Sequence, residues 1–247
     1  MNEKKVRTIK DIKAEKMDKA EKAYEKVIQY IKNEIRLGSL KRGQKLPPER
    51  ELADALGVSR NSVREALRTL DYMGFISSTQ GAGNYVTCDF ERCVGESMRY
   101  IMLLGETNFL QISQLRCGLE SEAAKLAAAR ILPKQLARMQ ELALLMRTEG
   151  NSEKVYRYDL DFHRLLCEAS GNHLILSFFS AMLRLFEDFI TTMHRRIIQD
   201  SEQAEKLYLS HEYLVEALAA HDGDAAFRTV WDHFEIVDRS IAEGNIL

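Results

Sequence analysis

The side chains with the clearest capacity for chemistry are one aspartate and three histidines in the second half of the chain. Asp159 and His163 are four residues apart, so on a helix they share one face and can reach a common ion. His211 and His233 stand at similar distances on either side of the segment 221–224. Antiparallel helices joined there would hold these two imidazoles at similar heights, and a carboxylate with three imidazoles is a typical ligand set for a divalent metal ion. The competing interpretation is a metal-free network of buried, hydrogen-bonded histidines.

Such a metal site also predicts the kind of ligand that it would take. Four protein ligands leave two positions vacant on an octahedral ion, and a single carboxylate among neutral imidazoles leaves the site positively charged. A small carboxylate, above all a 2-hydroxy acid that chelates through two oxygens, suits those positions. Arg116 can add a bidentate grip on the carboxylate group. An ion pair with Glu120, one helical turn further along, is the competing role for this arginine.

A second group of polar residues near the N-terminus of the chain could bind a polyanion. Arg60, Asn61 and Arg64 would lie together at the start of a helix that Ser59 caps. Cationic and amide side chains in that position are what a helix uses to reach phosphates and base edges in a DNA major groove. The other face of the same helix is apolar, with Val63, Ala66, Leu67 and Leu70.

The elements that position these residues lie between Leu46 and Val86. Pro47-Pro48-Glu49 predicts the start of a preceding helix, and Gly57 predicts its end, because the residue just past a helix often adopts a left-handed conformation. After Gly74 the spacing changes to period two around a glycine-rich tip, which predicts a two-stranded wing. The alternative is a helical hairpin with a purely structural β-extension.

This segment resembles the winged helix-turn-helix of GntR-type bacterial transcription regulators over about 65 residues. The resemblance is carried by the runs Leu46 to Ala53, Val58 to Arg60, Val63 to Leu67 and Gly81 to Gly83. It implies that Arg50, Arg60 and Arg64 are the main DNA-contacting cations. It also implies that Ser59 contacts a phosphate or base and that Gln80 and Gly81 form a wing tip that enters the minor groove. A solvated side chain is the alternative for each of these residues.

The remaining sequence predicts a mainly α-helical protein. An amphipathic helix from Ala23 to Gly38 should pack behind the helix-turn-helix within a DNA-binding domain of residues 21–88, preceded by a charged tail or frayed helix over residues 1–20. A boundary falls at residues 87–94. Beyond it, residues 91–243 should form an antiparallel all-α bundle of six or seven helices. The predicted helices cover residues around 98–104, 109–131, a segment that starts at Pro133, 153–169, 172–198, 202–220 and 225–242.

The second domain also resembles a known family. Arg116-x-x-x-Glu120, Asp159-x-x-Phe162-His163, Ala169-Ser170-Gly171-Asn172, and His211 with His233 across a Gly-Asp turn are similar to the FCD effector domain of the FadR subfamily. This resemblance covers residues 91–243. It implies that Asp159, His163, His211 and His233 bind a divalent ion, usually zinc or nickel.

Length, charge and cysteine content are consistent with this division. The chain of 247 residues suits two domains, and its net charge of −2 conceals an asymmetry. Residues 1–90 carry 18 basic and 13 acidic side chains, whereas residues 91–247 carry 17 and 24, so the first part is the one suited to a polyanion. The absence of a long apolar run predicts a cytoplasmic protein that does not enter a membrane. The cysteines, Cys88, Cys93, Cys117 and Cys167, lack metal-binding spacing and are predicted to be reduced, mostly core thiols.

Together these patterns predict a metabolite-responsive, DNA-binding transcription regulator rather than an enzyme. One winged domain touches few bases, so we expect a homodimer on an inverted-repeat DNA operator. We expect a repressor that a small organic acid releases. Two alternatives stay open: a metal-free regulator that binds a longer acyl ligand, and a metal-dependent enzyme that uses the same histidines. Against the enzyme, the sequence offers no further general base beside the ligands.

Overall fold

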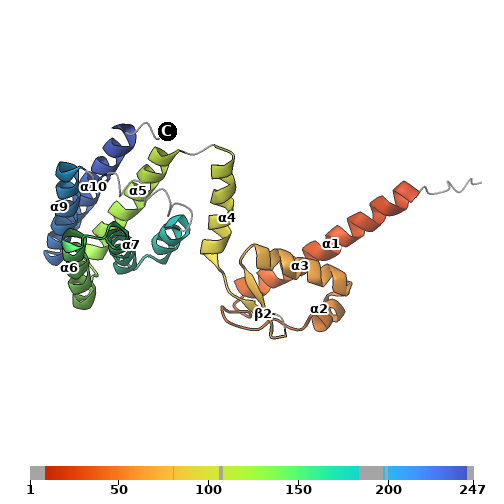
Figure 1. Ribbon diagram of the computed structural model, residues 1–247. Helices are drawn as coiled ribbons and strands as arrows, with labels where there is room; N and C mark the ends of the chain where they lie inside the picture. Colours follow the sequence, from red (N-terminus) through yellow and green to blue (C-terminus); the bar gives the residue numbers. More distant parts are fainter. Residues whose placement is uncertain (1–8, 80, 106–107, 184–196, 198–199, 244–247) are drawn as a thin grey trace, which may run out of the picture. The chain divides into compact units, whose positions relative to one another are not determined.

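The computed structural model describes residues 9–79, 81–105, 108–183, 197 and 200–243. As the sequence predicted, the described chain is mainly α-helical with one small antiparallel sheet (Figure 1). The Cα positions divide into two compact units, Met1–Cys93 and Val94–Leu247. None of the described helices is long and apolar enough to cross a membrane.

The N-terminal unit contains three helices and a two-stranded wing. Helix α1 (Ile9–Arg36) packs against α3 (Arg60–Tyr72), and α2 (Glu49–Leu56) packs against both. Because α1 begins at Ile9, residues 9–20 of the predicted tail or frayed helix are helical. Apolar residues from all three helices and the wing form the core: Val27, Ile28, Ile31, Leu46, Leu52, Ala53, Val63, Ala66, Leu67, Leu70, Ile76 and Val86.

Local signals in the sequence set the turn between α2 and α3. Gly57 follows α2 with φ +63°, a left-handed conformation that costs glycine little. Ser59 caps α3, because its Oγ accepts a hydrogen bond from the backbone N–H of Ser62 at 3.1 Å. The buried face of α3 is the predicted apolar stripe, so the polar residues at its start face outward.

The wing consists of β1 (Ile76–Thr79) and β2 (Gly83–Val86), paired from Ile76↔Val86 to Thr79↔Gly83. Lys45 forms a single bridge to Tyr85, which attaches the preceding loop to the wing. Gly83 has φ +107°, and a Cβ atom there would lie 2.7 Å from Cε of Lys45. Glycine at this position therefore lets the lysine side chain lie across β2.

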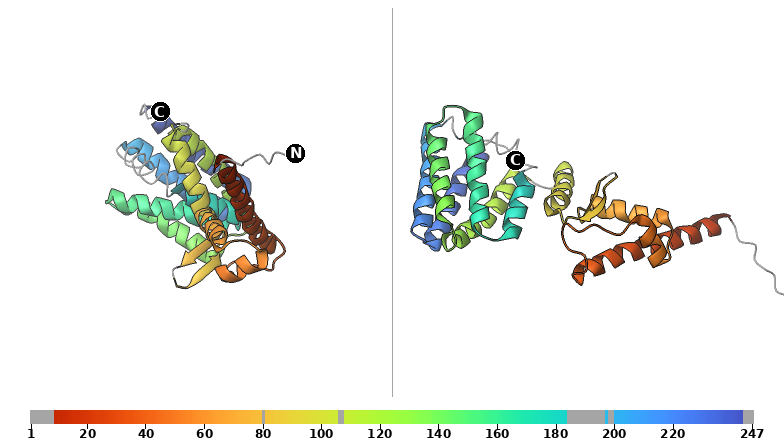
Figure 2. Two further views of the ribbon diagram at one scale, coloured as in Figure 1. Left: turned by 90° about the vertical axis from the view of Figure 1, so that its right-hand side faces the viewer. Right: turned by 90° about the horizontal axis from the view of Figure 1, so that it is seen from below.

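The helices after residue 108 form the predicted bundle. They are α5 (Phe109–Ala128), α6 (Pro133–Thr148), α7 (Ser152–Ala169), a helical segment at 173–183, α9 (Ser201–Ala219) and α10 (Gly223–Glu243). Helix α4 (Phe90–Leu103) precedes them and begins in the N-terminal unit. Helix α10 packs along α5 and α9, while α6 packs against α7 and α9, and α5 against α7 (Figure 2). Most of the predicted helix 172–198, from residue 184 to 196 and at 198, lies outside the described residues.

The turn between α9 and α10 is tied to another helix. Nδ1 of His221 lies 2.6 Å from the carbonyl oxygen of Ala128 at the end of α5. This contact holds the turn against the end of α5. The turn itself makes α9 and α10 packed neighbours, which is the arrangement needed to bring His211 and His233 together. Of the four free cysteines, Cys117 and Cys167 are buried, whereas Cys88 is exposed and Cys93 is half-buried.

Candidate metal centre and DNA-binding surface

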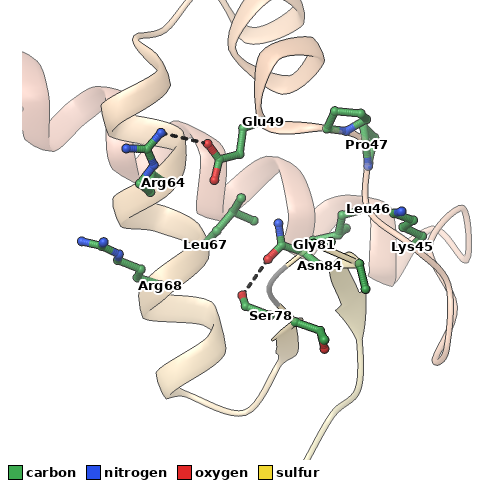
Figure 3. A pocket seen from close by; sticks show the side chains of 14 residues that line it. Lys45, Leu46, Pro47, Glu49, Arg64, Leu67, Arg68, Ser78, Gly81 and Asn84 are labelled. Atoms are coloured by element: carbon green, nitrogen blue, oxygen red, sulfur yellow. Dashed lines mark hydrogen bonds and ion pairs between the residues drawn. The ribbon is translucent and has the colours of Figure 1, made fainter.

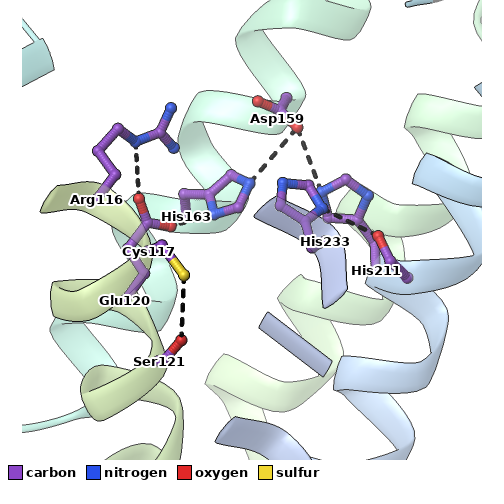
Figure 4. A network of polar contacts seen from close by, with 9 residues as sticks. Arg116, Cys117, Glu120, Ser121, Asp159, His163, His211 and His233 are labelled. Carbon is purple, nitrogen blue, oxygen red and sulfur yellow. Dashed lines mark hydrogen bonds and ion pairs between the residues drawn. The ribbon is translucent and has the colours of Figure 1, made fainter. Parts of the chain in front are cut away.

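Three histidines meet inside the bundle. His163 on α7, His211 on α9 and His233 on α10 are all buried, and each offers one nitrogen to a group whose atoms lie within 4.8 Å of one another (Figure 4). Donors placed about 2.1 Å from one tetrahedral ion lie about 3.4 Å apart, so the three nitrogens would have to move closer together to bind an ion.

Asp159 completes the predicted set. Its Oδ1 lies 3.3 Å from Nε2 of His211 and 3.6 Å from Nε2 of His163. Helical geometry explains the second contact, since Asp159 and His163 are one turn apart on α7. All four residues selected from the sequence are thus brought together, and each is more than nine-tenths buried.

Outer contacts orient two of the three imidazoles. Nδ1 of His233 lies 2.9 Å from Oγ of Ser210, and Nδ1 of His163 lies against Oε2 of Glu120. These contacts leave Nε2 as the nitrogen of each ring that is available to a metal ion. The arrangement is typical of metal-binding histidines, whose second nitrogen is held by a neighbouring polar group.

The donor atoms of the cluster fit a cation. Nε2 of His163 and both ring nitrogens of His211 are buried without a hydrogen-bond partner among the described residues. An unsatisfied buried polar atom costs about 1–3 kcal/mol. A divalent ion would satisfy these nitrogens, and imidazole nitrogen with carboxylate oxygen is a donor set that zinc and nickel accept.

The electrostatics of the cluster favour positive charge near the carboxylates. Burial lowers the pKa of His233 well below 6.5, and the neighbouring imidazoles lower it further, which keeps this ring neutral. Burial also works to lower the pKa of His163, but Glu120 and Asp159 outweigh it and raise the value to about 9. Without an ion, the cluster therefore attracts a proton, as expected of a site that compensates buried negative charge.

Arg116 lies on α5 beside this cluster. Its Nε donates to Oε1 of Glu120 at 2.8 Å, so the ion pair that competed with a ligand-binding role is present. The guanidinium carbon lies 5.2 Å from the ring centre of Phe234 and 5.7 Å from that of Phe179. Among the described residues the terminal amino groups of Arg116 make no hydrogen bond, which leaves them able to bind an anion.

Glu120, predicted only as an ion-pair partner of Arg116, also belongs to the site. It is fully buried. Burial works to raise its pKa, but Arg116 and then His163 outweigh this effect and lower the pKa below its ordinary value. A sequence signal existed: Glu120 shares helical spacing with the buried Ala123, Ala124 and Ala127, which places a charged side chain on the apolar face of α5.

The DNA-facing residues predicted in the N-terminal unit are exposed. Arg60 and Asn61 stand at the start of α3, and Arg50 on α2 lies 3.9 Å from Asp54 in a solvated pair. The hydroxyl of Ser59 serves as the cap of α3. Gly81 is exposed in the wing turn, while Gln80 lies outside the described residues.

A hollow of about 640 Å³ lies between α3, the wing and the start of α2 (Figure 3). Three cations line it: Arg64 and Arg68 from α3, and Lys45 from the loop before α2. Lys45 and Arg68 were not selected from the sequence, because Lys45 precedes the recognised motif and Arg68 stands two turns from the start of α3. Gly81 belongs to the lining, whereas Arg50, Ser59, Arg60 and Asn61 do not.

Two known protein families match this chain, one in each unit. The family described as "Bacterial regulatory proteins, gntR family" matches residues 23–86, and the FCD domain matches residues 111–236, about half of the chain. The chain is 30% identical to the HTH-type transcriptional regulator LutR of Bacillus subtilis over 83% of this chain and 94% of LutR. It is also 30% identical to the HTH-type transcriptional repressor NanR of an Enterobacter species, over 82% of this chain and 79% of that repressor.

A solved structure supports the same assignment. The GntR protein of Streptococcus agalactiae superposes with a TM-score of 0.63 at 26% sequence identity, over 87% of this chain and 99% of that one. Both matching families consist of transcription regulators rather than enzymes. The chain therefore belongs to the GntR family, as a DNA-binding transcription regulator of the FadR type whose FCD domain serves to sense a small molecule.

Proposed function

We propose that this regulator responds to a small carboxylate bound at a divalent metal ion in the FCD domain. The observation that carries the proposal is the convergence of Asp159 and three histidines from α7, α9 and α10, with unsatisfied nitrogens between them. A metal-free polar network would leave those buried nitrogens at a cost that native cores generally avoid.

The residues of the bundle would divide the work of binding. Asp159, His163, His211 and His233 would hold the ion, with zinc or nickel suited to this donor set. The ion would supply a positive centre with positions open to carboxylate oxygens. Arg116 would bind the same anion through its terminal amino groups, since its Nε is already used by Glu120.

The N-terminal unit would bind the operator through the residues at the start of α3 and around the hollow. Arg60, Asn61 and Arg64 would contact base edges and phosphates in the major groove. Arg50 and Ser59 would contact the flanking backbone, and the wing turn at Gln80 and Gly81 would enter the minor groove. Two such units in a homodimer would read an inverted repeat, because two-fold protein symmetry matches two-fold operator symmetry.

We propose that the effector relieves repression. NanR, with which this chain shares 30% identity, is named as a repressor, which supports repression rather than activation as the role of this chain. The effector can release DNA only if it binds the free state more tightly than the DNA-bound state. The difference in affinity between the two states sets the maximum response.

A thermal-shift screen of small organic acids, with and without a chelator, tests the proposal. We expect an acid that raises the melting temperature of metal-loaded protein and loses that effect after chelation. The Arg116→Ala variant should keep its metal by elemental analysis but lose the response to the acid. An equal shift in chelated, metal-free protein would instead support the regulator that binds an acyl ligand without metal.

A further inference from the structure

We propose that Glu120 is a positioning residue that links the metal site to the anion-binding arginine. The inference rests on the proposed function and concerns how one buried carboxylate serves both parts of the effector site. Glu120 is on α5, whereas the histidine that it contacts is on α7. Glu120 therefore connects α5 with α7, and the anion-binding arginine with a proposed metal ligand.

Each carboxylate oxygen of Glu120 contacts a different side chain. Oε1 accepts from Nε of Arg116 at 2.8 Å, and Oε2 lies against Nδ1 of His163 (Figure 4). The side chain of Glu120 has no exposed surface, so water does not compete for either oxygen. A buried carboxylate is stable only with such partners, which makes the two contacts interdependent.

The contact with His163 selects the ring nitrogen that faces the other ligands. A carboxylate accepts a proton donor, so it favours the form of His163 with hydrogen on Nδ1. When a metal ion displaces the second proton of this ring, the lone pair that binds the ion is on Nε2, the nitrogen that lies 3.6 Å from Asp159. Glu120 thereby presents His163 to the cluster in the form that can bind a metal ion.

The contact with Arg116 fixes which of its donors remain available. Glu120 takes Nε, and the rings of Phe179 and Phe234 lie close to the guanidinium. The two terminal amino groups are thus the ones left for a carboxylate ligand, and they form the bidentate fork of arginine. The negative charge of Glu120 also reduces repulsion between this guanidinium and a cation among the histidines.

Glu120→Gln tests the link, because the amide has one acceptor oxygen where the carboxylate has two. Arg116 and His163 face different oxygens of Glu120, so in the variant one of them faces the amide nitrogen, which is a donor. If the amide nitrogen faces His163, it favours hydrogen on Nε2 and blocks the metal-binding atom. We expect zinc to bind about 10–100-fold more weakly, as measured by competition with a chromophoric chelator. Ser121→Ala, at the equally buried next position of α5, is the matched control and should bind zinc normally.

Histidine ¹⁵N NMR supplies a readout that a purely structural role would not change. In the zinc-loaded protein without substitution, the ring of His163 should carry hydrogen on Nδ1, and Glu120→Gln should remove or shift that signal. Hydrogen on Nε2 of His163 in the unsubstituted protein would overturn the proposal even if the variant failed to fold. Equal zinc affinity of Glu120→Gln and the unsubstituted protein would overturn it too. If the unsubstituted protein binds no zinc, the proposed metal site itself fails, which is a separate result.

Discussion

Glu49 and Arg64 form an ion pair between the first turn of α2 and the second turn of α3, with Oε2 and Nη2 3.3 Å apart (Figure 3). Both side chains are at least one-third exposed, so the pair contributes only about 0.2–1 kcal/mol. A phosphate or base edge can displace such a partner. The arginine is therefore held beside the hollow at little energetic cost before DNA binds.

Removing the acidic partner should strengthen DNA binding. Glu49→Gln abolishes the ion pair that DNA must break and removes negative charge from the hollow, so we expect affinity to rise by about 1.5–5-fold. Fluorescence anisotropy with a short duplex measures this change. Weaker binding would show instead that Glu49 holds Arg64 in the orientation that DNA requires.

Arg64→Ala should weaken operator binding by about 1–3 kcal/mol while the fold stays intact, because the side chain is half exposed and makes only a surface pair. A gel shift with operator DNA and a thermal melt measure the two quantities. Arg138→Ala is the matched control, since Arg138 forms a similar exposed pair with Glu141 in the bundle. Equal affinities of the two variants would exclude a DNA contact for Arg64.

Lys45 and Arg68 should act as phosphate contacts on the two walls of the hollow. Replacing either with alanine should lower the slope of log affinity against log salt concentration by about 0.9 per contact. Binding should weaken to a similar extent on specific and non-specific DNA, since phosphates carry no sequence information. Arg157→Ala, which removes a solvated arginine from α7, should leave the slope unchanged. An unaltered slope in both variants would show that neither Lys45 nor Arg68 contacts a phosphate.

His211→Ala should remove the metal ion and the stabilisation that it provides. We expect metal content to fall from about one ion per chain to near zero, because one of four ligands is lost. The variant should also melt at a similar temperature with and without chelator, because it would have no ion to lose. His173→Ala, which changes an exposed histidine of the same domain, should retain the ion. Full occupancy in His211→Ala would exclude this residue as a ligand.

Local signals made most of the fold predictable. Gly57 and Ser59 define the turn before α3, and the apolar spacing of Val63 to Leu70 gives the buried face that the structure has. Pro133 starts α6 as expected, because its fixed φ suits a first helical turn. The start of the first helix was harder to predict. The charged sequence between residues 9 and 20 has no clear apolar stripe, although it forms the first turns of α1.

The candidate site was only partly predictable. Helical spacing alone pairs Asp159 with His163, and symmetric distances from the 221–224 turn place His211 near His233. The contact between Glu120 and His163 could not be predicted this way, because it depends on how α5 packs against α7. Lys45 likewise reaches the hollow through the bridge to Tyr85, a pairing between a loop and a wing.

The three histidines come from segments far apart along the chain, with 48 residues from His163 to His211 and 22 from His211 to His233. An ion held by all three would act as a removable cross-link that closes two loops at once. A permanent cross-link that closes a loop of this length lowers the conformational entropy of the unfolded chain. It thereby raises the free energy of unfolding by about 3 kcal/mol or more. The stability of the FCD domain would then depend on whether the ion is bound. Loss of the ion would destabilise the same helices that bind the effector.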